Sequence, residues 1–255
     1  MNTGMKFDLT NKVALVTGAS GGLGEHFARV LAAHGAKVVV AARRVDKLAA
    51  LVESLGKDKA FAVAMDVTDG DSIRAGFDEA EQALGPLDIV VNNAGISVVK
   101  NTLEMSDADW DEVADVNLRG AWIVAQTAAK HMVASKRGGR IVNIASITGI
   151  RTIGQIPAYA ASKAALIHLT QVLAMEWARH NIAVNALAPG YIETDLNRAF
   201  WQTPPGQALI KRVPQRRLGQ PKDLDGPLLL LSSDAGAFMT GAVLVVDGGH
   251  TVNAL

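Results

Sequence analysis

The strongest constraint on the fold is a regular alternation of short apolar, β-branched runs with longer segments of helical spacing. Seven of these runs are predicted to be buried strands: Val13–Thr17, Lys37–Ala41, Phe61–Ala64, Ile89–Asn92, Arg140–Ile144, Ile182–Ala188 and Val243–Val246. The predicted helices between them include Gly22–His34, Asp71–Leu84, Asp107–Ala134 and Tyr159–His180. Strands and helices in this order build a parallel sheet covered on both faces, so the chain is predicted to form a doubly wound α/β fold.

The length of the chain and two interruptions of this pattern predict how it is organised. A chain of 255 residues that is 49% hydrophobic can bury one large core, so residues 1–255 are expected to form a single domain. Residues 191–220 contain several prolines and glycines and are expected to form a mobile substrate lid. In Pro221–Leu231 the pair Gly226-Pro227 interrupts a helical pattern, which predicts a kinked helix.

The composition argues against several classes of partner. Lys plus Arg and Asp plus Glu number 25 each without long blocks of one sign, so neither nucleic acid nor a membrane is expected as a partner. The chain has no cysteine, and its six histidines show no metal-ligand spacing, so no metal site is expected. The N-terminal residues lack the apolar region of a signal peptide, which favours a cytoplasmic protein.

A glycine-rich turn follows the first predicted strand and opens into a helix. It reads Thr17-Gly18-Ala19-Ser20-Gly21-Gly22-Leu23-Gly24. Glycines let the backbone turn sharply and approach a pyrophosphate, which the N-terminus of the helix also attracts. Flavin proteins and methyltransferases carry similar loops, so the turn alone indicates nucleotide binding without deciding which nucleotide.

A second polar loop, Asn92-Asn93-Ala94-Gly95, follows the fourth predicted strand. In a doubly wound sheet the first and fourth strands are neighbours where the strand order reverses, and ligands bind there. The two loops are therefore predicted to face one crevice. The alternative is that Asn92 and Asn93 are ordinary turn residues.

Tyr159 and Lys163 lie four residues apart in a predicted helix and so share one of its faces. An ammonium group there favours the phenolate, and lowering the tyrosine pKa of about 10 by ~3 units takes about 4 kcal/mol. A surface contact four residues apart is the plainer interpretation of this pair. Ser146 lies just after the end of the fifth predicted strand, thirteen residues before Tyr159, which places its hydroxyl beside that helix.

The glycine-rich turn and the Ser…Tyr-x-x-x-Lys spacing together resemble the short-chain dehydrogenase/reductase family, whose fold is Rossmann-like. The resemblance implies a nicotinamide-dependent oxidoreductase that interconverts a ketone and a secondary alcohol. Ser146 and Tyr159 would bind the carbonyl oxygen, with Tyr159 as general acid/base. Lys163 would hold the ribose and lower the pKa of Tyr159, and Asn117 would hold a water that extends the proton path.

Further motifs along the chain extend this resemblance to the cofactor and to the substrate. Asp66-Val67 is similar to the family's adenine contact, and Pro189-Gly190 with Thr194 to its nicotinamide contact. The implied cofactor site is Gly18, Ser20, Gly22, Leu23, Gly24, Arg43, Asp66, Val67, Asn93, Ala94, Gly95, Tyr159, Lys163, Pro189, Gly190, Ile192 and Thr194. Residues 190–195 resemble a loop of 3-oxoacyl thioester reductases, so such a thioester is one expected substrate. Sugar, steroid and simple aliphatic or aromatic ketones are the alternatives.

The form of the cofactor depends on the residues directly after the second predicted strand. NAD-selecting relatives carry an acidic residue at the position of Ala42, and here Arg43 comes next, where a guanidinium can bind a 2′-phosphate. NADP(H) is therefore predicted over NAD(H). Gly21 weakens this prediction, because many NADP-preferring relatives have a basic residue at that position. The alternative role for Arg43 is that of a solvated loop charge without a contact to the cofactor.

The remaining expectations concern the lid, the assembly and a rival class of function. Lys211, Arg212, Arg216 and Arg217 either meet the phosphate of a phosphopantetheine or CoA group or are solvated lid charges. Trp201 is a candidate substrate contact inside the lid. Long helices with apolar residues on more than one face, and the family resemblance, predict a homotetramer. The rival interpretation is a nucleotide-binding sensor or scaffold without turnover.

Overall fold

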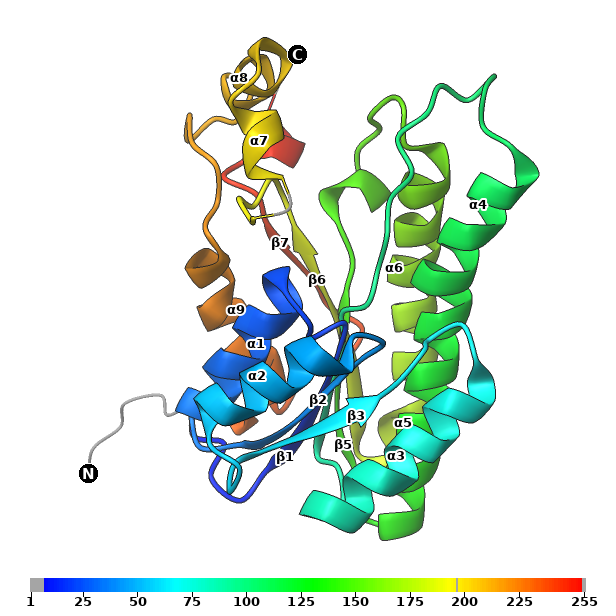
Figure 1. Cartoon of the computed structure of the whole chain (residues 1–255), viewed down its shortest axis with the longest axis vertical. Coiled ribbons are helices and arrows are strands. Elements are labelled where there is room, and N and C mark those ends of the chain that lie inside the picture. Colours follow the sequence, from blue (N-terminus) through cyan, green and yellow to red (C-terminus); the bar gives the residue numbers. More distant parts are fainter. Residues whose placement is uncertain (1–6, 196, 254–255) are drawn as a thin grey trace.

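The computed structural model describes residues 7–195 and 197–253 (Figure 1). Its centre is one seven-stranded sheet with the strand order β3-β2-β1-β4-β5-β6-β7, in which all neighbouring strands are parallel. The strands are β1 (Val13–Thr17), β2 (Lys37–Ala42), β3 (Ala60–Ala64), β4 (Ile89–Asn92), β5 (Gly139–Ile144), β6 (Ile182–Pro189) and β7 (Val243–Val246). After β3 the chain crosses to the other half of the sheet, and β4 lies beside β1. The strand order therefore reverses between β1 and β4, and the carboxyl ends of these two strands are the expected ligand site.

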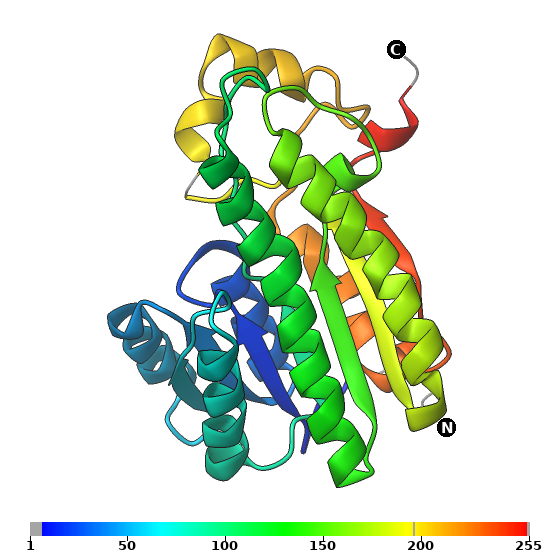
Figure 2. The same ribbon diagram turned by 90° about the vertical axis from the view of Figure 1, so that its right-hand side faces the viewer.

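Helices cover both faces of this sheet, as Figures 1 and 2 show. One face carries α1 (Gly22–Ala33), α2 (Val45–Leu55) and α9 (Asp225–Ser232). The other carries α3 (Gly70–Leu84), α4 (Asp107–Ala114), α5 (Ala121–Ser135) and α6 (Pro157–Trp177). The prediction of a doubly wound, Rossmann-like fold with seven parallel strands is confirmed.

The core is split into two apolar layers by the sheet. Along β1, Ala14 and Val16 pack with the helices of one face, whereas Val13 and Leu15 pack with those of the other. All five residues of β1 are buried, as are the four residues of β4. Strands buried on both faces read as continuous apolar runs, which is why their limits could be predicted to within one residue.

Two helical segments differ from their predictions. The predicted helix Asp107–Ala134 is α4 and α5 joined by a π-helical turn, Asp115–Gly120. At Gly120 a Cβ would lie 2.5 Å from the carbonyl oxygen of Val67, so the widened turn sits where another backbone passes closely. The helix α2 had no predicted counterpart.

The prediction of a kinked helix over Pro221–Leu231 was wrong. A 3-10 turn, Pro221–Leu224, precedes α9, and Pro227 lies in the first turn of that helix. The first-turn amides of a helix have no partner within it, so proline there costs no hydrogen bond and causes no kink.

Residues 191–195 and 197–220 lie above the carboxyl ends of the strands (Figure 1). They contain two short helices, α7 (Arg198–Trp201) and α8 (Pro204–Ile210), and Thr203 caps the second through its side chain. Their position fits a lid over the ligand site, and their mobility stays a prediction.

Candidate active site

The loops after β1 and β4 are tied together by Thr17, which is fully buried. The Oγ1 of Thr17 accepts hydrogen bonds of 3.0 Å from the backbone N–H groups of Asn93 and Ala94. In return, Nδ2 of Asn93 donates to the carbonyl oxygen of Thr17 at 2.9 Å. The prediction that two polar loops face one crevice therefore holds, and Thr17 is the residue that fixes their spacing.

The glycine-rich turn is shaped by close backbone contacts. Gly18 has a φ of +68°, in the left-handed region that favours glycine, and a Cβ on Gly24 would lie 2.3 Å from the Gly18 carbonyl oxygen. The helix α1 begins at Gly22 with no side-chain cap, so its first amide groups keep free hydrogens. Free amides at a helix N-terminus fit the pyrophosphate of a dinucleotide.

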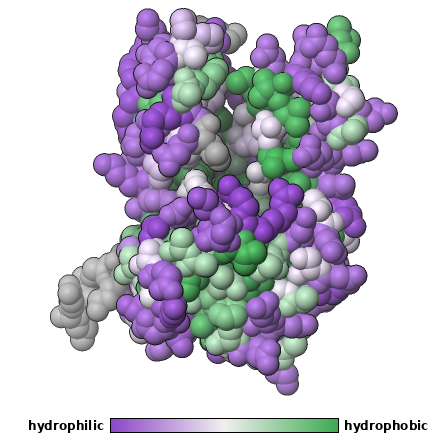
Figure 3. Space-filling model, viewed as in Figure 1, coloured by the Kyte–Doolittle hydropathy of each residue, from purple (hydrophilic) through white to green (hydrophobic). Residues whose placement is uncertain are grey.

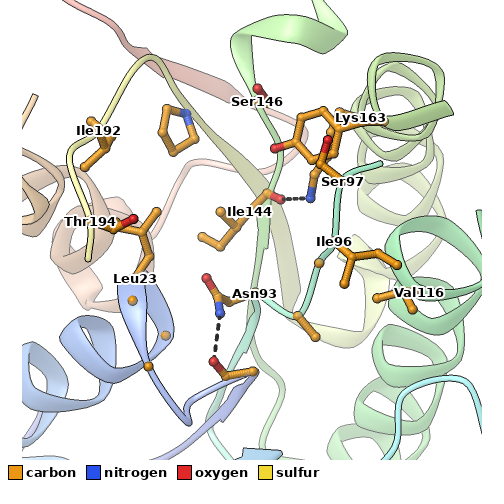
Figure 4. A pocket seen from close by; sticks show the side chains of 18 of the residues that line it. Leu23, Asn93, Ile96, Ser97, Val116, Ile144, Ser146, Lys163, Ile192 and Thr194 are labelled. Atoms are coloured by element: carbon orange, nitrogen blue, oxygen red, sulfur yellow. Dashed lines mark hydrogen bonds between the residues drawn. The ribbon is translucent and has the colours of Figure 1, made fainter. Parts of the chain in front are cut away.

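A cavity of about 750 Å³ opens at these loops, and the molecule is visibly hollowed there in Figure 3. Every predicted site residue except Asn117 lines it. Leu23 and Asn93 lie at one end, Ser146 and Lys163 at another, and Thr194 on the side opposite Lys163 (Figure 4). Lining residues that no sequence motif had singled out include Arg44, Met65, Ile96, Ser97, Val116, Thr148 and Asn197.

Tyr159 and Lys163 reach this cavity from the first two turns of α6. Pro157 starts the helix, and its fixed φ suits that position. Lys163 is only 4% exposed; its Nζ donates 2.8 Å to the carbonyl oxygen of Ile144 (Figure 4) and lies 5.6 Å from the centroid of the Tyr159 ring. The prediction that Tyr159 and Lys163 share one helix face is confirmed. Because Lys163 is buried, the alternative of a surface contact between the two residues is wrong.

Ser146 is oriented by a residue that sequence reasoning missed. Its Oγ accepts two hydrogen bonds from Thr148, one from the backbone N–H at 3.1 Å and one from Oγ1 at 3.0 Å. The hydroxyl hydrogen of Ser146 is then left to donate toward Tyr159 or a substrate oxygen. The Ser-x-Thr spacing is typical of a hydroxyl turn and could have indicated this contact.

The pKa values at this site follow from burial. Burial raises the pKa of Tyr159 above its ordinary value, and the hydrogen bond with Ser146 acts in the opposite direction. Burial also lowers the pKa of Lys163 to about 8. The predicted lowering of the Tyr159 pKa by Lys163 was wrong for the protein without cofactor: the pKa of Tyr159 is raised, because desolvation of the phenolate outweighs the other effects.

Asn117 lies behind the cavity wall in the π-helical turn and is fully buried. Its Oδ1 accepts a hydrogen bond of 2.8 Å from the backbone N–H of Ile96, and its Nδ2 donates to Ile96 O and to Ser162 Oγ. A Cβ on Gly95 would lie 3.3 Å from Asn117 Oδ1 and 3.5 Å from Lys163 Nζ. Asn117 therefore braces the β4 loop beside Lys163, and its role in holding a water stays a prediction.

The end of the cavity next to β2 carries two arginines. Ala42 ends the strand without a carboxylate. Hydrogen bonds from Thr68 lower the pKa of Asp66, and the charge of the nearby Arg43 acts in the same direction. Arg44 turns back to the glycine-rich loop, where its Nη2 donates to Ser20 Oγ at 2.9 Å. Arg44 thus joins Arg43 as a candidate phosphate contact, and nothing in its local sequence indicated that direction.

Aromatic side chains of the lid segment cover the end of the cavity that lies away from the two arginines. Trp201 is 5% exposed, lines the cavity and packs against Tyr191 with ring centroids 5.2 Å apart. Its Nε1 is buried without a hydrogen-bond partner among the described residues. Asn197, also missed, holds the loop by bonding Thr194 N and Ile192 O, both at 2.8 Å.

The sheet is doubly wound, and one cavity at its edge is lined by the glycine-rich turn, the uncapped helix α1 and the group Ser146, Tyr159 and Lys163. This arrangement is that of a dinucleotide-binding oxidoreductase. Residues 12–205 match the family model described as short chain dehydrogenase. The chain belongs to the short-chain dehydrogenase/reductase family, as its motifs predicted, and it is an oxidoreductase that uses a nicotinamide dinucleotide.

Three relatives show the range of the family near this chain. The NAD-dependent glycerol dehydrogenase of Listeria innocua is 35% identical over 246 residues, covering 96% of each chain. The gluconate 5-dehydrogenase of Gluconobacter oxydans is 39% identical over 250 residues, covering 97% of each. A crystal structure of a gluconate 5-dehydrogenase from Burkholderia cenocepacia with NADP and tartrate has a TM-score of 0.93 and 39% identity, covering 98% of each chain.

Two further findings concern metal ligands and membrane spans in the described part of the chain. Residues 7–195 and 197–253 bring no three His, Asp or Glu side chains into a group that could hold a metal ion. Within the same ranges no helix combines the length and the apolar character needed to cross a membrane.

Proposed function

We propose that this protein is an NADP(H)-dependent dehydrogenase that interconverts a secondary alcohol and a ketone on a small, polyhydroxylated substrate. The observation that carries the proposal is the meeting of Ser146, Tyr159 and Lys163 at the wall of the cavity that the glycine-rich turn also lines. The names of two relatives, a glycerol and a gluconate dehydrogenase, support a polyhydroxylated substrate. The expected 3-oxoacyl thioester gains no support from these relatives.

The residues of this site divide the chemistry between them. When bound, the nicotinamide exchanges a hydride with the substrate carbon. Ser146 Oγ and Tyr159 Oη hold the substrate oxygen, and in ketone reduction Tyr159 gives its proton to that oxygen. Burial keeps the Tyr159 hydroxyl protonated, which suits this direction. In alcohol oxidation Tyr159 takes the proton, and the neighbouring Lys163 ammonium favours the phenolate that must form first.

The cofactor is held along the cavity from the glycine-rich turn to the lid. The free amides of α1 receive the pyrophosphate, Lys163 the ribose next to the nicotinamide, and Thr194 the carboxamide. The preference for NADP(H) rests on Arg43 and Arg44 beside Ala42, where no carboxylate repels a 2′-phosphate. The NADP in the Burkholderia gluconate 5-dehydrogenase structure supports this preference.

Residues 191–220 act as the substrate lid of a single-domain enzyme. The indole N–H of Trp201 is the donor that the lid offers to a substrate hydroxyl, because it is buried beside the cavity with no partner among the described residues. A buried donor left without a partner costs free energy, and a bound hydroxyl would remove that cost.

The test is to replace Tyr159 by Phe and to follow nicotinamide absorbance with a panel of polyols and sugar acids. General acid/base catalysis contributes about 10²–10⁴-fold, so kcat is expected to fall at least a hundredfold while the Kd for NADP⁺ stays within twofold. Wild-type kcat in Tyr159→Phe would contradict the mechanism. A non-catalytic nucleotide sensor would instead bind NADP⁺ and turn over no member of the panel.

A further inference from the structure

A second cavity, of about 490 Å³, adjoins the catalytic one. Ile147, Thr148, Ile153 and Tyr191 line both, so the two spaces meet beside the residue that orients Ser146. The rest of the second cavity is lined by Arg151, Thr152, Leu209, Arg212, His250 and Asn253. A substrate whose reacting carbon is held at Ser146 can therefore extend its chain into this second space.

The residues of ranges 7–195 and 197–253 that line the second cavity include two arginines and no carboxylate. Arg151 is fixed by neutral groups, because its Nη1 donates to the backbone carbonyls of His250 and Asn253. Its Nε and Nη2 form no hydrogen bond with any residue in the described ranges, although a guanidinium has five donors.

Arg212 is the second unneutralised cation. Within residues 7–195 and 197–253 its guanidinium forms neither an ion pair nor a hydrogen bond, whereas Arg198 and Arg217 of the same segment are paired with Glu193 and Asp223. The lid therefore pairs some of its arginines and leaves the one at the second cavity open. Arg212 is exposed, as Lys211 is, so its place in the lining of the second cavity is what distinguishes it from a solvated lid charge.

Neutral polar groups complete the lining. His250 packs against Tyr191 with ring centroids 5.0 Å apart, and its Nδ1 is buried without a hydrogen-bond partner among the described residues. Burial and the charge of Arg151 lower the pKa of His250, against the opposing effect of Asp247, so the imidazole is neutral near pH 7. The positive charge of the cavity is thus that of Arg151 and Arg212, with a neutral ring nitrogen beside them.

We propose that this second cavity binds the carboxylate of the substrate, which makes the substrate a sugar acid and not a neutral polyol. The proposal rests on the proposed function, since it assigns the substrate class of the same site. Guanidinium groups bind carboxylates through charge-assisted and often bidentate hydrogen bonds. A polyhydroxylated acid would place its carboxylate at Arg151 and Arg212 and its reacting carbon at Ser146 and Tyr159.

The test compares pairs of substrates that differ only at one end. D-gluconate and D-glucitol carry the same hydroxyl configuration, with a carboxylate in one and a hydroxymethyl group in the other; D-galactonate with galactitol and D-mannonate with D-mannitol extend the panel. We expect at least tenfold higher kcat/KM for one or more acids than for the matched polyol. D-glucitol 1-phosphate, which carries a phosphate at the end where D-gluconate has its carboxylate, tests whether a phosphate is preferred over the carboxylate.

The variant is Arg212→Gln, because Arg151 also holds the backbone near the C-terminus. We expect kcat/KM for the acid to fall at least tenfold, mainly through KM, with the activity on the polyol within twofold of wild type. Lys211→Gln is the matched control: Lys211 is the preceding residue, is exposed, and does not line the cavity. It should leave both substrates unchanged.

Three outcomes overturn the proposal while the dehydrogenase assignment stands. They are a polyol used as well as its acid, an equal loss on both substrates in Arg212→Gln, and a preference for the sugar phosphate. If no compound is turned over, the proposed function fails on this panel, and calorimetric titration of each acid into the protein with NADP⁺ decides the carboxylate site. Binding by wild type that Arg212→Gln loses supports the site; no binding of any acid refutes it.

Discussion

The guanidinium of Arg44 rests on Ser20, with Nη2 2.9 Å from the Ser20 hydroxyl oxygen, although the two residues are 24 positions apart. A Cβ on Gly21 would meet the same Nη2 at 3.8 Å. The connection between β2 and α2 thus brings a cation to the position where Gly21 leaves the glycine-rich turn without a basic side chain. The lack of a basic side chain at Gly21 weakened the prediction of NADP(H), and Arg44, from the loop after β2, supplies a cation at that place.

Arg44→Ala is expected to lower kcat/KM for NADPH about tenfold and to leave kcat/KM for NADH within twofold. The reason is that a charge-assisted hydrogen bond to the 2′-phosphate, worth about 1.5–3 kcal/mol, is lost only with NADPH, and the exposure of Arg44 puts the loss at the lower end. Steady-state rates with both cofactors measure this. Lys47→Ala, on the exposed side of α2, is the control, and an equal loss with both cofactors would refute the role.

Gly24→Ala is expected to weaken NADP⁺ binding at least tenfold and to lower Tm. Its Cβ would lie 2.3 Å from the Gly18 carbonyl oxygen and 2.6 Å from Asn93 Nδ2, so the turn must move, and such overpacking costs about 1–3 kcal/mol. Gly21→Ala is the matched control, because the nearest atom to its Cβ is Arg44 Nη2 at 3.8 Å. Fluorescence titration and thermal unfolding report both effects; similar behaviour of the two variants would show that close packing is not what Gly24 provides.

Lys163→Met is expected to flatten the rise of stability with pH. In wild type the folded pKa of Lys163 is about 8 and the unfolded pKa about 10.4, so between these values the unfolded chain binds more protons and the free energy of unfolding rises with pH. The rise from pH 7 to 9.5 is about 2 kcal/mol by linkage. Urea unfolding at the two pH values measures it, and an equal change with pH in wild type and Lys163→Met would show that Lys163 is not depressed.

A homotetramer is expected in solution, built by pairing α5 and α6 with their counterparts. Trp122 of α5 is 41% exposed and Met175 of α6 is 76% exposed, and burying such side chains across two-fold axes is the usual route to association. Light scattering at micromolar concentration should give four times the chain mass of 26.8 kDa. Trp122→Glu should lower that mass, and a monomeric wild type would contradict the prediction.

Local patterns determined most of the architecture and the catalytic group. Strand limits could be predicted because β1 and β4 are buried on both faces, which leaves uninterrupted apolar runs in the sequence. Tyr159 and Lys163 could be paired because a helix fixes the direction of side chains four residues apart. These features depend on the residues themselves and on backbone periodicity, so one sequence suffices to predict them.

Tertiary structure alone decided the contacts that tune the site. Arg44 reaches Ser20, and Arg151 reaches His250, 99 positions away, because loops above the sheet fold over one another, and no periodic pattern encodes how they do so. The pKa of Tyr159 differs from its predicted direction for the same reason: the spacing of Lys163 is local, whereas the burial that raises the pKa is set by the whole cavity wall. Backbone periodicity depends on residues that are close in the sequence. The desolvation of a group and the charges around it depend on every segment that packs against it, however distant in the sequence.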